Sequence, residues 1–171
     1  SQTPTYAALK LLIDNWRWEG VPFYLRSGKS MERKVSEISI EFKLPPYSMF
    51  GAFHCPAANR LSMCIQPDEG IHFSFDAKVP DRNRKIQSVD MEFHYRDAFK
   101  HNDLPDAYER LLLDAVHGDA SLFARSDEIQ RAWQLVDPVI EGWEPSPEAP
   151  PLSTYEPGNW DKYPVNLYRP N

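Results

Sequence analysis

The spacing of apolar residues changes once along this chain, and the change limits the folds that it can adopt. Before residue 100, apolar and polar residues alternate with a period of two, which is typical of strands with one apolar face. After residue 100 the period becomes about 3.6, which indicates helices. Short turns and no crossover helices separate the strands, so they should pair antiparallel. We expect an α+β fold, a large, mainly antiparallel sheet with helices packed on one side.

Five segments are predicted to be strands: 21–25, 35–42, 61–66, 71–78 and 89–95. In the second of them Ile38, Ile40 and Phe42 share the apolar face. Residues 6–13 fit either period, and their composition favours helix, so their structure stays open.

Two helices are predicted in the second half. The first has an apolar face with Leu111 and Ala115 and stops at Gly118. The second begins with Ser126 as its N-cap, and Pro138 should kink or end it. Its buried stripe is predicted to be Ile129, Trp133, Val136 and Ile140. Seven prolines follow from residue 145, so 145–171 should form an extended tail around the domain.

Composition narrows the possible partners. The 171 residues suit one domain, and a net charge of −6 lacks the broad basic face that nucleic acid or an anionic membrane needs. No apolar run approaches the roughly 18 residues of a membrane span, and no signal peptide opens the chain. Two cysteines favour a reducing compartment. The chain starts without methionine, and we expect that an upstream domain is absent.

Most motifs for cofactors and metals are missing from the sequence. It contains neither G-x-G-x-x-G nor a P-loop, so it shows no dinucleotide or nucleoside-triphosphate site. His72 and His94 fall opposite the apolar face of predicted strands, and we expect them to be sheet-surface residues. His54 and Cys55 with Cys64 match no paired-ligand spacing, so no metal site is expected.

Three polar residues are better candidates for a ligand site. Residues 15–29 end in Arg-Ser-Gly-Lys, and Lys29 and Lys34 flank a short connection between two predicted strands. Their ammonium groups could converge on one anion, although a lysine after a glycine is more often an exposed turn residue. Gln66 closes another strand, and its amide could both donate to and accept from sugar hydroxyls.

Long segments of the chain resemble the C-terminal domain of the glucose-6-phosphate dehydrogenase family. The resemblance covers essentially all 171 residues, and motifs of this length are very specific. It is carried by TYAALKLLIDNWRWEGVPFYLRSGK at 5–29, KVSEISIEFK at 34–43, IQP at 65–67, the gap-free run at 104–139 and YEPGNW at 155–160.

The resemblance implies an activity. The family oxidises C1 of glucose 6-phosphate in the pentose phosphate pathway, forms 6-phosphogluconolactone and passes the hydride to NADP, sometimes NAD. Lys29 matches its first substrate lysine, Lys34 its second basic substrate position, and Gln66 a glutamine that contacts substrate in some members. The resemblance also implies a cytoplasmic enzyme that forms a homodimer through the sheet of this domain.

Two departures from the family limit that expectation. The catalytic histidine and the Asp-His-Tyr-Leu-Gly-Lys motif lie with the family's Rossmann coenzyme domain, and neither occurs here. We therefore expect the chain alone to be inactive, without catalytic or cofactor-binding residues. Some members of the family place basic residues for a second NADP where this chain has Val35 and Cys64. No second NADP should therefore bind to this chain. The alternative is a stand-alone module for sugar-phosphate binding or subunit assembly, or, less favoured, a regulatory partner of a full-length enzyme.

Overall fold

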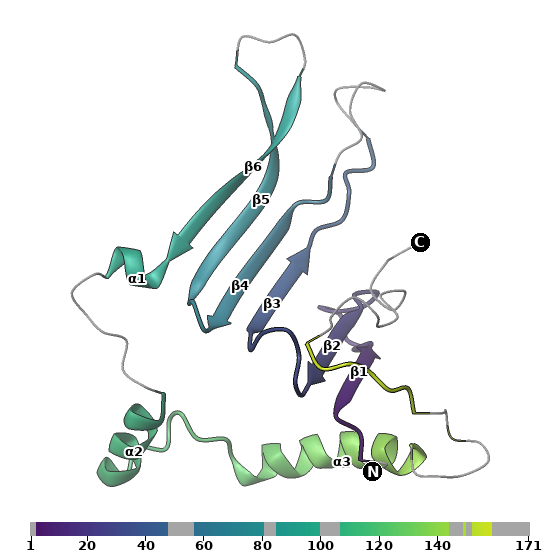
Figure 1. Ribbon diagram of the computed structural model, residues 1–171, viewed down its shortest axis with the longest axis vertical. Helices are drawn as coiled ribbons and strands as arrows, with labels where there is room; N and C mark the ends of the chain where they lie inside the picture. The colour runs from purple at the N-terminus through teal and green to yellow at the C-terminus, as the bar shows by residue number, and fades with distance from the viewer. Residues whose placement is uncertain are drawn as a thin grey trace. The chain divides into compact units, whose positions relative to one another are not determined.

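The computed structural model describes residues 3–47, 57–80, 85–99, 107–143, 149 and 152–158. The chain divides into two compact units. The first unit joins Ser1–Arg33 to Ala107–Asn171, and the second is Lys34–Asp106. Figure 1 shows strands in both units and the two longer helices in the first.

The first unit contains a two-stranded antiparallel sheet. Strand β1, Tyr6–Leu11, pairs with β2, Phe23–Gly28, over their whole lengths. The pairing makes residues 6–11 a strand, in a segment, 6–13, for which the sequence fits either helix or strand. Hydrogen bonds to a neighbouring strand outweigh the weak helical preference of a short segment.

A local polar contact shapes the connection between β1 and β2. The side-chain oxygen of Asn15 accepts hydrogen bonds from the backbone N–H of Arg17 at 3.1 Å and of Trp18 at 2.9 Å. Gly20 then adopts a φ of 72°, which other residues rarely do. The Trp18 ring meets the Phe23 ring edge to face at 5.1 Å, so the turn is attached to the strand that follows it.

The second unit is a four-stranded sheet in which every neighbouring pair is antiparallel. Its strands are β3 (Ser36–Glu41), β4 (Arg60–Gln66), β5 (Gly70–Lys78) and β6 (Ile86–His94), in that order. The α+β class is confirmed, with the strands divided between a two-stranded and a four-stranded sheet. Tyr95, predicted as strand, instead opens the short helix α1, Tyr95–Ala98.

The register gives this sheet two different faces. Ile38, Met63, Ile71 and Phe93 occupy one row across the four strands, and the row beside it is Ile40, Leu61, Phe73 and Met91. The row between these two is polar and consists of Ser39, Ser62, His72 and Glu92. The predicted alternation of apolar and polar residues is therefore confirmed. No apolar side chain in the described ranges is buried, and contiguous exposed apolar surface is typical of contact sites.

Helices α2, Ala107–His117, and α3, Ser126–Gly142, form the helical part of the first unit. Gly118 ends α2 with a φ of 72°, which confirms the predicted stop. The predicted N-cap of α3 is wrong by one residue, because Arg125 is the cap and Ser126 is already helical. The Asp127 carboxylate instead accepts from the Glu128 N–H at 3.0 Å and pairs with Arg125 at 2.9 Å.

One prediction about α3 is corrected and another is narrowed. Pro138, expected to kink or end the helix, lies inside it and does not end it, because the loss of one backbone donor leaves the flanking turns hydrogen-bonded. The predicted buried stripe is exposed, with 46% of Ile129 and 56% of Trp133 accessible. Helical spacing places these residues on one face, but only a packed neighbour would bury them.

The part of the chain that the structure describes contains no helix both long and apolar enough to cross a membrane. Most of the predicted tail at 145–171 lies outside the described residues, as do His54 and Cys55. Segment 152–158 is described and carries no helix or strand.

Candidate functional site

The backbone of Lys29 is hydrogen-bonded on both sides. Its N–H donates to the carbonyl oxygen of Thr5 at 2.9 Å, which continues the pairing of β1 and β2 by one residue. Its own carbonyl oxygen accepts from the Tyr155 hydroxyl at 2.8 Å. The side chain remains exposed. A flexible ammonium group therefore starts from a backbone position that three separate segments of the chain hold in place.

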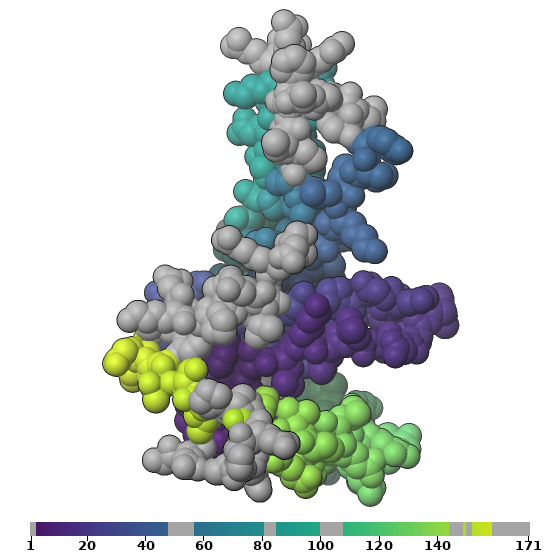
Figure 2. All heavy atoms as spheres, turned by 90° about the vertical axis from the view of Figure 1, so that its right-hand side faces the viewer, coloured from purple at the N-terminus to yellow at the C-terminus, as the bar shows by residue number. Residues whose placement is uncertain are grey.

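Tyr155 connects the tail to this end of the β1–β2 hairpin. Its hydroxyl lies 3.0 Å from Oγ1 and 3.2 Å from the carbonyl oxygen of Thr5, in addition to its contact with Lys29. The Tyr155 ring meets the Tyr6 ring edge to face at 6.2 Å. The Gly158 N–H donates to the carbonyl oxygen of Ser30 at 2.8 Å. Figure 2 shows the yellow tail segment beside the purple N-terminal residues.

The residues on either side of Lys29 suit this close packing. A Cβ on Gly28 would lie 2.7 Å from Sδ of Met31 and 2.8 Å from Cδ2 of Tyr6, so a larger residue would push its neighbours apart. Ser30 adopts a φ of 52°, in the left-handed region, and turns the chain directly after the lysine. The Gly-Lys-Ser sequence thus ends β2 in a sharp bend.

Lys34 and Gln66 belong to the second unit. Gln66 is the last residue of β4, and its register partner Ser36 is the first residue of β3. The Gln66 Nε2 donates to Ser36 Oγ at 2.9 Å, which orients the amide. Lys34 stands two residues before Ser36, so it approaches the same end of this strand pair.

The three predicted residues offer binding groups only. Lys34 and Gln66 share one end of the β3–β4 pair, whereas Lys29 belongs to the first unit. Two ammonium groups and an amide can neutralise a phosphate and hydrogen-bond sugar hydroxyls. Neither an ammonium group nor an amide accepts a hydride, so the groups that these three residues offer are groups for binding.

Sequence reasoning missed the role of Tyr155 and Thr5 at this site. The YEPGNW motif resembles the family's tail, but the motif alone indicates no function for its tyrosine. The contacts of Tyr155 with Thr5 and Lys29 span 150 and 126 positions of the sequence, a separation that no local pattern encodes.

Comparison with known proteins points to the same family that the sequence motifs resemble. The family model for "Glucose-6-phosphate dehydrogenase, C-terminal domain" matches residues 1–167. Glucose-6-phosphate 1-dehydrogenase from Borreliella burgdorferi is 49% identical over 143 residues, which is 84% of this chain and 30% of the relative. The enzyme of the same name from Treponema pallidum is 43% identical over 163 residues, 94% of this chain and 31% of the relative.

Solved structures give the same result. A glucose-6-phosphate dehydrogenase in complex with its substrate glucose-6-phosphate matches 98% of this chain with a TM-score of 0.87 and 33% identity, over 34% of its own length. The Mycobacterium avium enzyme matches 94% with a TM-score of 0.74 and 37% identity, over 32% of its length. The chain thus spans about a third of the relatives that it matches. On this evidence the chain belongs to the glucose-6-phosphate dehydrogenase family and corresponds to its C-terminal domain.

Proposed function

We propose that this chain is the C-terminal domain of an enzyme that oxidises glucose 6-phosphate to 6-phosphogluconolactone, with NADP as hydride acceptor. The enzyme would act in the pentose phosphate pathway of the cytoplasm. Both units would belong to this one domain, since one family model spans them. The observation that carries the proposal is the two-sided hydrogen bonding of the Lys29 backbone, which presents an exposed ammonium from a fixed point.

The proposed role of Lys29, Lys34 and Gln66 is to bind and orient glucose 6-phosphate. Lysine ammonium groups pair with phosphate through charge-assisted hydrogen bonds, which are stronger than neutral ones. The Gln66 amide, oriented by Ser36, would contact a sugar hydroxyl. Holding C1 in a reactive orientation lowers the barrier because the entropy of alignment is lost on binding and not in the reaction.

The described residues do not form the kind of fold that binds a nicotinamide coenzyme in dinucleotide-binding domains. Dinucleotide-binding folds use parallel strands and a glycine-rich turn. The strand pairs in the described ranges are antiparallel, and the sequence lacks the glycine fingerprint. NADP would therefore be bound by residues outside this chain, and we propose that the chain alone is inactive.

The proposal is tested with the full-length protein and with the 171-residue chain side by side. NADP reduction is followed by absorbance with glucose 6-phosphate and with glucose, and sugar-phosphate binding to the chain is followed by calorimetry. We expect reduction by the full-length protein only, and only with the phosphorylated sugar. A full-length protein that binds glucose 6-phosphate without reducing NADP would contradict the enzymatic proposal and support a stand-alone binding module.

A second part of the proposal is pairing with another copy through the four-stranded sheet. The polar face carries serines on neighbouring strands, with Ser39 and Ser62 Oγ atoms 3.2 Å apart and those of Ser74 and Ser88 3.4 Å apart. Two sheets pack face to face at about 10 Å, a spacing that short side chains permit. Their hydroxyls can also hydrogen-bond across an interface.

A further inference from the structure

Three potential metal ligands come together on the polar face of the four-stranded sheet. His72 on β5 and Glu92 on β6 are register partners. His94 lies two residues beyond Glu92 on the same strand, so its side chain emerges on the same face. One ligand atom from each of the three side chains falls within 4.8 Å of the other two.

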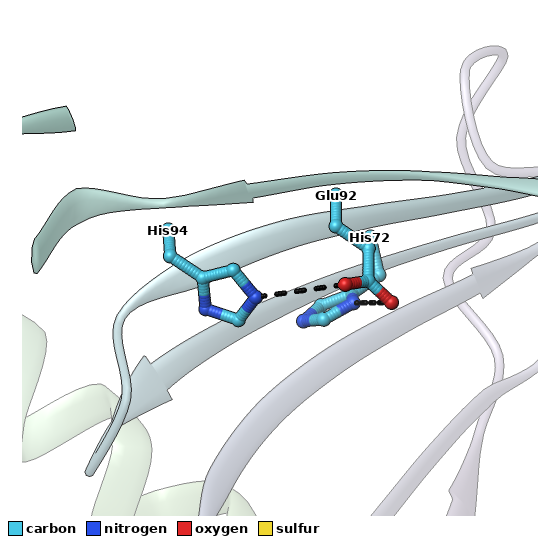
Figure 3. Close-up of side chains that lie close together, drawn as sticks. All are labelled: His72, Glu92 and His94. Carbon is cyan, nitrogen blue, oxygen red and sulfur yellow. Dashed lines mark ion pairs between the residues drawn. The ribbon is translucent and has the colours of Figure 1, made fainter. Parts of the chain in front are cut away.

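The Glu92 carboxylate bridges the two imidazole rings. Its Oε1 lies 3.5 Å from Nδ1 of His72, and its Oε2 lies 3.8 Å from Nε2 of His94; Figure 3 draws both contacts as dashed lines. Zinc–nitrogen bonds of 2.0–2.1 Å place the ligand atoms of a tetrahedral site about 3.3 Å apart. Small side-chain rotations would therefore bring these atoms to coordination distance of one ion.

A second carboxylate orients one of the rings. Oδ2 of Asp68 lies 3.3 Å from Nδ1 of His94, the ring nitrogen turned away from the cluster. In protein metal sites the non-ligating nitrogen of a histidine almost always contacts a carboxylate or carbonyl, which sets the tautomer and the ring orientation. With its proton on Nδ1, His94 directs the lone pair of Nε2 at the cluster.

A buried glycine makes room for this arrangement. Gly70 is the register partner of His94. A Cβ at position 70 would lie 3.4 Å from Nδ1 of His94 and only 2.6 Å from the carbonyl oxygen of Phe93. The close approach of β6 to β5 at this point, and with it the position of the His94 ring, thus depends on the absence of a side chain.

We propose that His72, Glu92 and His94 bind a divalent transition-metal ion, with zinc as the best match. Imidazole and carboxylate ligands suit zinc better than the all-oxygen sites of magnesium or calcium. In the single chain the three side chains are 26–58% exposed, so a water molecule can complete the four ligands there. The bound ion would join β5 to β6 beside the β4–β5 turn, a role separate from sugar-phosphate oxidation.

The test is calorimetric titration of zinc chloride into the metal-free full-length protein. We expect a site of low micromolar affinity, weakened at least tenfold by His72→Asn, Glu92→Gln or His94→Asn. Asp68→Asn should weaken it about tenfold through the orientation of His94. The control is His117→Asn, which changes a histidine on α2 outside the cluster and should leave affinity unchanged.

Thermal unfolding separates metal binding from a general loss of stability. Zinc should raise the melting temperature of the unchanged protein and of the His117 variant, and not that of the three ligand variants. Each ligand variant should keep its far-ultraviolet circular dichroism spectrum without metal. The proposal is overturned if no saturable zinc binding occurs, or if His72→Asn, Glu92→Gln and His94→Asn all retain the affinity of the unchanged protein.

Discussion

The Tyr155 hydroxyl donates a hydrogen bond to the carbonyl oxygen of Lys29 at 2.8 Å, across 126 positions of the sequence. This contact attaches a proline-rich segment to the residue that should bind the substrate phosphate or a sugar oxygen. Lys29 is also paired with Thr5 through its N–H, so its backbone is constrained from two directions. A substrate lysine held in this way loses less conformational entropy on binding.

Replacement of Tyr155 by phenylalanine should weaken substrate binding by the full-length enzyme. The ring and its contact with Tyr6 are kept, and only the hydroxyl contacts with Lys29 and Thr5 are lost. A net hydrogen bond contributes about 1 kcal/mol, so KM for glucose 6-phosphate should rise about fivefold. Steady-state kinetics measure the effect, with Tyr47→Phe as a control at a side chain that is 87% exposed. An unchanged KM would remove Tyr155 from the support of Lys29.

Replacement of Lys29 by alanine should have a larger effect on the same enzyme. Loss of a charge-assisted contact with the substrate should lower kcat/KM by about 2–4 kcal/mol, a fall of roughly 30-fold to 1,000-fold. The matched control is Lys43→Ala, another exposed lysine that follows β3. If both variants lost activity equally, the effect would reflect general charge and not a site at Lys29.

A bulky charge on the polar face of the sheet should separate the proposed dimer. Ser88 is exposed on β6 and contacts Ser74, so Ser88→Arg should be tolerated by the single chain but not by two closely packed sheets. Sedimentation analysis of the full-length protein should show mostly monomer for this variant. Ser27→Arg, on β2, should remain dimeric. A Ser88→Arg protein that stays dimeric would place the interface elsewhere.

The connection between α2 and α3 contains a carboxylate that should affect stability in acid. Hydrogen bonds from the side chain and the backbone N–H of Ser121 hold the pKa of Asp119 below its ordinary value of 3.8. Because the pKa of Asp119 is lower in the folded chain, its hydrogen bonds stabilise the fold fully at any pH above its pKa in the unfolded chain. This stabilisation is lost as the pH falls through the pKa of Asp119 in the folded chain. Asp119→Asn should therefore reduce the pH dependence of the free energy of unfolding, measured with denaturant between about pH 2 and 6. Asp127→Asn is the control, and equal curves for the Asp119 variant and the unchanged protein would contradict the prediction.

Much of the local structure could be predicted because its cause is local. Alternation of apolar residues correctly predicted β3, β4, β5 and β6 and their faces, and a glycine after a helical pattern correctly predicted the end of α2 at Gly118. Predictions that depend on neighbours were weaker. Residues 6–11 form a strand because β2 pairs with them, and the apolar stripe of α3 is exposed because spacing alone does not bury a side chain.

In the candidate sites, too, some features have local causes and others depend on contacts between distant segments. Motifs that resemble one family predict Lys29, Lys34 and Gln66 as binding residues, and alternation correctly predicts that His72 and His94 lie opposite an apolar face. The contact of Tyr155 with Lys29 and the place of Glu92 between the two histidines become visible only in the folded chain. Both depend on strand register and on hydrogen bonds between residues far apart in the sequence. His72 and Glu92 lie 20 positions apart in the sequence, and a shift of one residue in pairing would turn one of them to the other face.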